Sequence, residues 1–290
     1  MKKITFALLL FTVAMGNAQI TYNSTDFAAI NDSFLVSHAT VVTGLDFTTA
    51  GANVSWDYST LTPNTQETLL WENPNNTGYK TSWCFSNNYL FNCNSQFNTN
   101  FNLATKATDG LVIQGFGVTN AYMHSKLTTA NFSNKMIGAN ISVTGLTLPF
   151  TVSYTQPDVL YQFPMNYNDN YTNASNLAFD LTALGLPLTY TSAGQRTNVV
   201  EGWGSLITPF GTFPNVLKMK STLVEDITLV VQGQSTPTTQ TTISYKWFDP
   251  AYGIPVLEVS GQEVAGQWLP TTTTYIDIQR CLDPTSLFHA

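Results

Sequence analysis

Carboxylates are the side chains through which this chain could catalyse a reaction. Acidic residues recur along the second half of the sequence, at Glu201, Glu225, Asp226, Asp249, Glu258 and Glu263. Two such acids brought together by a fold suffice to hydrolyse a glycosidic bond, one as the acid and one as the base or nucleophile. The chain has no Gly-x-Ser-x-Gly nucleophile motif and no phosphate-binding loop. We therefore predict no catalytic residue from sequence, and a carbohydrate-active hydrolase using two carboxylates is one alternative function.

Histidines and cysteines give little support for a metal centre. His38, His124 and His289 are isolated, without a His-x-x-x-His pair or a neighbouring acidic cluster. Transition-metal sites need several such ligands at short, recognisable spacings. The sequence predicts neither a metal site nor a cofactor.

Aromatic residues are the remaining candidates for binding. Trp247 shares one face of a predicted strand with Ile243 and Tyr245, and this apolar face is expected to point inward. Trp203 and Tyr252 lie beside predicted turns, where a ring could be exposed. Flat aromatic faces suit sugar rings and apolar ligands. We therefore take Trp203, Tyr252 and Trp247 as candidate ligand-binding residues.

The N-terminal segment predicts export. Lys2 and Lys3 precede an apolar run over residues 4–15, and the small residues of 16–18 come directly before Gln19. This is the pattern of a cleaved signal peptide spanning residues 1–18. We expect a secreted or periplasmic protein, with no transmembrane segment after cleavage.

Three cysteines fit an oxidising compartment. Cys84 and Cys93 are near enough in sequence to form a disulfide that closes a small loop. A Cys84–Cys281 bridge is the rival pairing, and Cys281 is otherwise left over. The sequence predicts the Cys84–Cys93 bridge.

Net charge limits the possible partners. The chain has a formal net charge of −7, with 11 basic and 18 acidic side chains. Nucleic-acid binding needs a basic surface, so no nucleic-acid partner is expected. The same acidic balance argues against adsorption to anionic lipid.

The pattern of apolar residues predicts an all-β fold, mostly antiparallel, built as a curved sheet or β-sandwich. Period-two alternation occurs over 54–58, 217–223, 227–231 and 243–247. Turn residues lie between such runs, at 209–211 and 249–253.

Other segments are less regular. Residues 87–102 are rich in asparagine and predict a long exposed loop. Residues 175–184 fit either a helix ending before Gly185 or a twisted strand. We expect a single all-β domain over residues 19–290, with a possible subdomain seam near 146–151.

Five segments of the chain resemble a known group of proteins. Residues 44–59, 157–169, 202–217, 245–250 and 253–257 are similar, in order, to motifs of uncharacterised secreted proteins of Bacteroidota, especially flavobacteria. The resemblance implies export and a β fold, and it supplies no catalytic residue. Many such proteins continue into a C-terminal sorting domain for type IX secretion. This chain ends without that domain, a departure from the resemblance that counts against surface export and leaves the periplasm open.

The sequence as a whole favours an exported, non-enzymatic envelope or surface protein. The expected partner is a glycan, an apolar ligand or another envelope protein. The hydrolase above and a purely structural β domain remain the alternatives. Two convergent carboxylates in a cleft would favour the hydrolase, and an aromatic strip or apolar cavity would favour binding.

Overall fold

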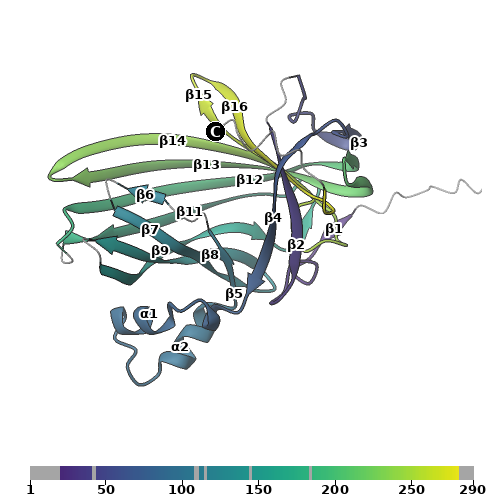
Figure 1. The fold of residues 1–290 in the computed structure, drawn as a ribbon. Coiled ribbons are helices and arrows are strands. Elements are labelled where there is room, and N and C mark those ends of the chain that lie inside the picture. The colour runs from purple at the N-terminus through teal and green to yellow at the C-terminus, as the bar shows by residue number, and fades with distance from the viewer. Residues whose placement is uncertain are drawn as a thin grey trace, which may run out of the picture.

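Strands make up most of the described chain, and Figure 1 shows them wrapped around a common interior. The structure is a computed structural model that describes residues 20–40, 44–107, 111–113, 116–143, 146–182 and 185–280. The first half contains β1 (Thr21–Tyr22), β2 (Ser33–Ala39), β3 (Gly51–Asp57), β4 (Pro63–Glu72), the 3-10 turn η1 (Pro74–Asn76), α1 (Lys80–Ser86), α2 (Cys93–Asn100), β5 (Leu103–Lys106), β6 (Leu111–Ile113), β7 (Phe116–Leu127) and β8 (Asn131–Val143). The second half contains β9 (Leu146–Gln162), β10 (Met165–Asn166), β11 (Asn170–Asp180), β12 (Leu188–Thr208), β13 (Gly211–Val231), β14 (Gln234–Phe248), β15 (Leu257–Val264) and β16 (Gln267–Ile276).

Twelve of these strands form one closed antiparallel sheet. The order around it is β2-β4-β5-β7-β8-β9-β11-β12-β13-β14-β15-β16, and β16 pairs with β2 to complete the circuit. Neighbours in space therefore follow the order of the chain. Short turns make this possible: Gln232–Gly233 and Ala265–Gly266 each have two positive φ angles, as the twist of a two-residue hairpin requires. The predicted all-β, mostly antiparallel fold is confirmed.

Strand β3 lies outside this circuit. It pairs in parallel with residues 202–207 of β12, beyond the part of β12 that pairs with β11. Gly204 permits this approach, because a Cβ there would overlap the Val54 carbonyl oxygen. The ring of Trp56 in β3 then packs edge-on against that of Trp247.

Strand β14 is consequently buried on both faces over residues 243–248, whereas residues 234–239 are exposed. Tyr245 and Trp247 face the cover formed by the β3 segment, whereas Ser244 and Lys246 face the interior of the closed sheet. Successive residues of a strand point to opposite sides. Ser244 and Lys246, the polar residues of this buried part, therefore lie in an enclosed space and not in bulk solvent.

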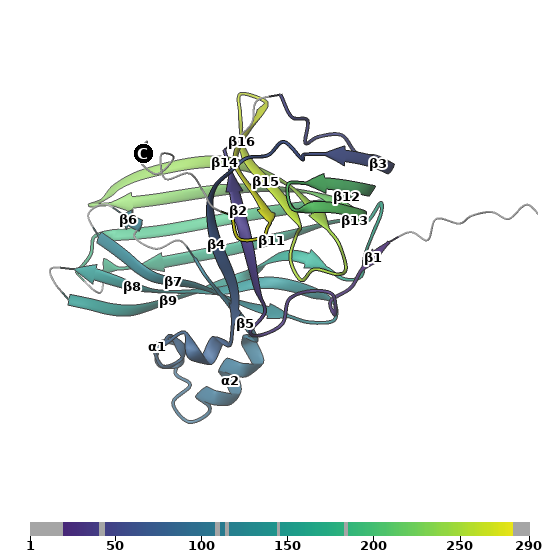
Figure 2. The same ribbon diagram turned by 45° about the vertical axis from the view of Figure 1, so that its right-hand side comes forward.

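Helices α1 and α2 pack on the outer face of the sheet. Both views place them outside the closed sheet, near β8 and β9 (Figures 1 and 2). Trp83 of α1 donates a hydrogen bond from Nε1 to Ser153 Oγ at 3.0 Å. A disulfide joins Cys84 to Cys93 and so connects the two helices, which confirms the predicted bridge and excludes the Cys84–Cys281 pairing.

One local prediction is wrong, and one open alternative is decided. Residues 93–100, predicted as exposed loop, form α2, whose Phe97 is fully buried against Trp83 and Phe101. Of the two alternatives left open for residues 175–184, the strand is confirmed over 175–180, because each of these residues belongs to β11 and pairs with a residue of β12. The strands predicted at 217–223 and 227–231 are parts of one long strand, β13. The predicted signal peptide, Cys281 and His289 lie outside the described residues.

Candidate functional site

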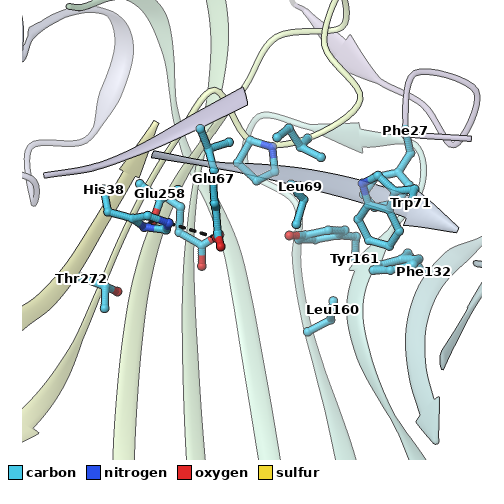
Figure 3. Close-up of a pocket in the computed structure, with 14 residues that line it drawn as sticks. Phe27, His38, Glu67, Leu69, Trp71, Phe132, Leu160, Tyr161, Glu258 and Thr272 are labelled. Carbon is cyan, nitrogen blue, oxygen red and sulfur yellow. Dashed lines mark hydrogen bonds and ion pairs between the residues drawn. The ribbon is translucent and has the colours of Figure 1, made fainter. Parts of the chain in front are cut away.

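The candidate site is a pocket inside the closed sheet, with a volume of about 360 Å³. Residues from β2, β4, β8, β9, β15 and β16 line it, so opposite walls of the sheet contribute to one space. Figure 3 shows aromatic rings on one side of this space and polar side chains on the other. Ligand pockets typically have volumes of ~300–1,000 Å³, so this one suits a small ligand.

Four rings form the aromatic wall: Phe27, Trp71, Phe132 and Tyr161. Phe27 contacts the other three, with ring centroids 4.4 Å from Phe132 and 5.3 Å from Trp71. Phe132 also stacks on Tyr161 at 5.9 Å. Because each ring is held by its neighbours, the wall is preorganised.

Trp71 adds a polar atom to the aromatic wall. Its Nε1 is buried and has no hydrogen-bond partner among the described residues. An unsatisfied buried donor costs about 1–3 kcal/mol. Because the atom is enclosed by protein, a ligand in the pocket does not reach it.

The polar wall carries His38, Glu67, Glu258, Thr272 and Thr274. His38 bridges two of them: its Nε2 lies 3.0 Å from Glu67 Oε1, and its Nδ1 lies 3.0 Å from Thr274 Oγ1. The Glu67 side chain is 61% exposed, which places it at the mouth of the pocket. This wall offers mainly acceptors to a ligand.

Lys246 fixes the position of Glu258. The Lys246 Nζ lies 3.0 Å from Glu258 Oε1 and donates a hydrogen bond to the Tyr161 hydroxyl at 3.2 Å. Burial by itself would lower the pKa of Lys246, but the Glu258 carboxylate outweighs it and the pKa is raised. Lys246 is therefore a cation at neutral pH, and the Glu258 carboxylate is its counter-ion.

A second ion pair lies nearby in the interior. Arg196 of β12 makes two hydrogen bonds of 2.7 Å to Asp158 of β9 and one of 2.9 Å to Ser221 of β13. The Arg196 charge also influences the pKa values of Lys246 and Tyr161, so the two ion pairs are electrostatically coupled. The arrangement buries both positive charges with partners, as burial of charge requires.

The residues predicted from sequence lie elsewhere. Trp247 is fully buried against Trp56 and Tyr58, on the opposite face of β14 from Lys246, and presents no ring face to a ligand. Tyr252 packs against Phe213 at 5.4 Å, and Trp203 packs against the main core. None of the three lines the pocket.

The alternation of apolar and polar residues along β14 is the sequence pattern that could have pointed to the site. It places Lys246 on the polar face of the predicted strand, and the turn at 249–253 brings β15 and Glu258 alongside. What the sequence pattern lacks is any sign that this polar face encloses a pocket.

Metal binding and membrane spanning have no support in the described residues. No group of three or more His, Cys, Asp or Glu side chains is placed to hold a metal ion among them. Within the same residues, no helix has the length and apolar character needed to cross a membrane. Comparison with family models, curated proteins and solved structures found no match to this chain.

Proposed function

We propose that this chain is an exported, non-enzymatic binding protein whose ligand occupies the pocket inside the closed sheet. The observation that carries the proposal is the division of that pocket into an aromatic wall and a wall of carboxylates and hydroxyls (Figure 3). A ligand that fits both walls has a flat apolar face and several hydroxyl groups. A short glycan has this chemistry.

Each wall supplies a different part of the binding energy. The aromatic wall provides the apolar surface against which the C–H groups of a sugar ring pack. Glu67 and Glu258 accept hydrogen bonds from hydroxyl groups on the other side. The ion pair with Lys246 keeps the Glu258 carboxylate in place before the ligand arrives.

Calorimetry and thermal unfolding with a panel of oligosaccharides and small apolar ligands test the proposal. A ligand at 100 times its Kd adds about 2.7 kcal/mol to the free energy of unfolding. In Thr272→Trp the indole enters the pocket, so binding and the thermal shift are lost. Thr271→Trp adds the same side chain at a neighbouring position that does not line the pocket, and binding is retained. Equal binding by both variants would contradict the assignment.

A hydrolase is the second candidate, because Glu67 and Glu258 line one pocket. The geometry favours binding over hydrolysis, because the Glu258 carboxylate is held in an ion pair with Lys246 and the Glu67 side chain is largely exposed. Glu258→Gln separates the two functions. A hydrolase would lose turnover in this variant, whereas no product should form with either protein if the pocket only binds.

Export rests on the N-terminal pattern of residues 1–18. The Cys84–Cys93 disulfide supports it, since such bonds persist mainly in oxidising compartments. Mass spectrometry of the protein from its native host should find Gln19 at the N-terminus. A purely structural β domain, the third alternative, predicts no ligand and a flat thermal-shift screen.

A further inference from the structure

Three large apolar side chains are exposed where α1 is joined to α2. Phe85 is 74% exposed, Leu90 67% and Phe91 102%. Figures 1 and 2 show this connection at the end of the helix pair farthest from the sheet. We call Phe85, Leu90 and Phe91 the apolar tip. Exposed apolar groups of this size, gathered in one place, mark interaction sites.

The apolar tip stands on a rigid support. Directly beneath it, Trp83, Phe97 and Phe101 form a buried cluster with Met136 of β8. Gly138 of β8 lets the support sit close to the sheet, because a Cβ there would overlap the Tyr79 ring. The disulfide between Cys84 and Cys93 closes the connection that carries the tip. The side chains of the tip are therefore exposed, although residues next to them in the sequence are buried in this cluster.

Charged side chains around the tip are few and mostly positive, although the chain as a whole is acidic. Residues 81–105 contain no charged side chain, and residues 73–157 contain four lysines and one aspartate. Three of these lysines reach α2: the Nζ of Lys80 contacts Asn94 Oδ1, that of Lys126 contacts the Asn98 carbonyl oxygen, and that of Lys135 contacts Asn100 Oδ1. Burial and the nearby Lys126 ammonium lower the pKa of Lys135, as expected where positive charges gather.

We propose that the helix pair docks the protein on a lipid bilayer that contains anionic lipid, with the apolar tip inserted among the headgroups and upper acyl chains. An uncharged segment enters this zone without the cost of desolvating a charge. A helix rises 1.5 Å per residue, so Asn98 lies roughly 8 Å along α2 from Cys93, the first residue of the helix and the one that follows the tip. Lys126 and Lys135 then reach the level of the anionic headgroups. The chain as a whole is acidic, so its net charge does not reveal this local positive surface.

Vesicle sedimentation with protein that begins at Gln19 tests the proposal, since this form contains every described residue and lacks the apolar N-terminal run. We expect binding to vesicles of phosphatidylcholine with phosphatidylglycerol, weaker binding to phosphatidylcholine alone, and loss of binding as salt increases. The triple variant Phe85→Ser/Leu90→Ser/Phe91→Ser should bind at least about tenfold more weakly. Val264→Ser/Leu269→Ser removes exposed apolar side chains from the β15–β16 hairpin and should leave binding unchanged.

Two further variants separate charge from insertion. Lys126→Gln/Lys135→Gln should weaken binding to the anionic vesicles roughly tenfold or more and reduce its salt dependence, since each lysine contributes about fivefold. Phe91→Trp places an indole in the tip, and its emission should shift to shorter wavelength and be quenched by brominated lipid. Circular dichroism of each variant checks that the fold is kept.

Three results would overturn the proposal: no binding to either kind of vesicle, binding that the triple variant retains, or an indole at position 91 that lipid does not quench. A dimer that the triple variant converts to monomer, without vesicle binding, would instead make the tip a contact between two copies. The test is independent of the pocket, because Thr272→Trp should bind vesicles as the unmodified protein does.

Discussion

The interior of the closed sheet and the helix pair outside it depart from ordinary burial in opposite ways. In the interior, Lys246 and Arg196 are largely buried, each with a carboxylate partner. On the helix pair, Phe91 and Leu90 stand in solvent with a buried cluster directly below them. Charged groups are seldom fully buried unless paired, and contiguous apolar groups are seldom left exposed.

The difference between the two regions indicates how each works. Because the buried charges in the interior are paired, polar groups can line the pocket while the sheet stays folded. An exposed apolar tip adds nothing to folding and is explained only by what it contacts. We therefore expect changes in the interior to alter stability and changes at the tip to alter association.

Breaking the Arg196–Asp158 pair should have the largest effect on stability. Arg196→Met leaves the Asp158 carboxylate, 9% exposed, without its two hydrogen bonds. Loss of one partner of a buried ion pair costs about 3–5 kcal/mol. Urea unfolding followed by tryptophan fluorescence measures this change.

The double variant Arg196→Met/Asp158→Asn is the matched control for that experiment. It removes the negative charge as well, so much of the lost stability should return. A single variant that costs less than about 1 kcal/mol would mean that Asp158 finds solvent, and the interior would not be the enclosed space described here.

Acid should act on the support of the helix pair through His124. This histidine is buried beside Phe97 and Phe101, its Nε2 lies 2.8 Å from Thr77 Oγ1, and burial lowers its pKa from 6.5 to about 4. The unfolded chain binds a proton below pH 6.5, whereas the folded chain stays neutral until about pH 4. Stability is therefore full above pH 6.5 and falls by about 3 kcal/mol as the pH drops to 4.

Urea unfolding at a series of pH values measures this loss. His124→Gln should flatten the dependence between pH 6.5 and 4. Asp46, whose pKa is lowered to about 2 by hydrogen bonds from Thr48 and Thr49, loses its contribution only below about pH 4. An unchanged slope in His124→Gln would show that this histidine is solvated in the folded chain.

Sequence patterns predicted the strands better than the site. Alternation located β13 and β14, because it reports which face of a strand is apolar. It does not report whether the polar face meets bulk water or an enclosed pocket, and that depends on the pairing of β16 with β2 far apart in the chain. The pattern therefore places Lys246 on the polar face without marking it as a site residue, and Trp247, on the apolar face, was predicted to bind a ligand.

Helix α2 was missed for a different reason. Its residues are mostly Asn, Ser and Thr, which are weak helix formers. An isolated helix of this length is unstable in water, and tertiary packing supplies the missing stability. Phe97 supplies that packing by entering the cluster around Trp83, and the disulfide at Cys93 limits the alternatives open to the unfolded chain.

Removing the disulfide should therefore affect the helix pair and leave the interior unchanged. The two cysteines are nine residues apart, and a loop of this length stabilises by about 2–3 kcal/mol. In Cys84→Ser/Cys93→Ser we expect faster amide hydrogen exchange over residues 80–100 and weaker vesicle binding. Ligand binding in the pocket should be unchanged, and a loss there would mean that the two regions are coupled.

The smallest effect on stability is expected at the tip itself. Phe91 is fully exposed, so Phe91→Ser should change the free energy of unfolding by less than about 0.5 kcal/mol, as should Val264→Ser on the β15–β16 hairpin. Urea unfolding should not distinguish these two variants in solution, and only vesicles containing anionic lipid should, through weaker binding of Phe91→Ser. A large loss of stability in Phe91→Ser would show that this ring packs against the protein. The tip would then belong to the fold, and the contrast between a region that stabilises and a region that associates would not hold.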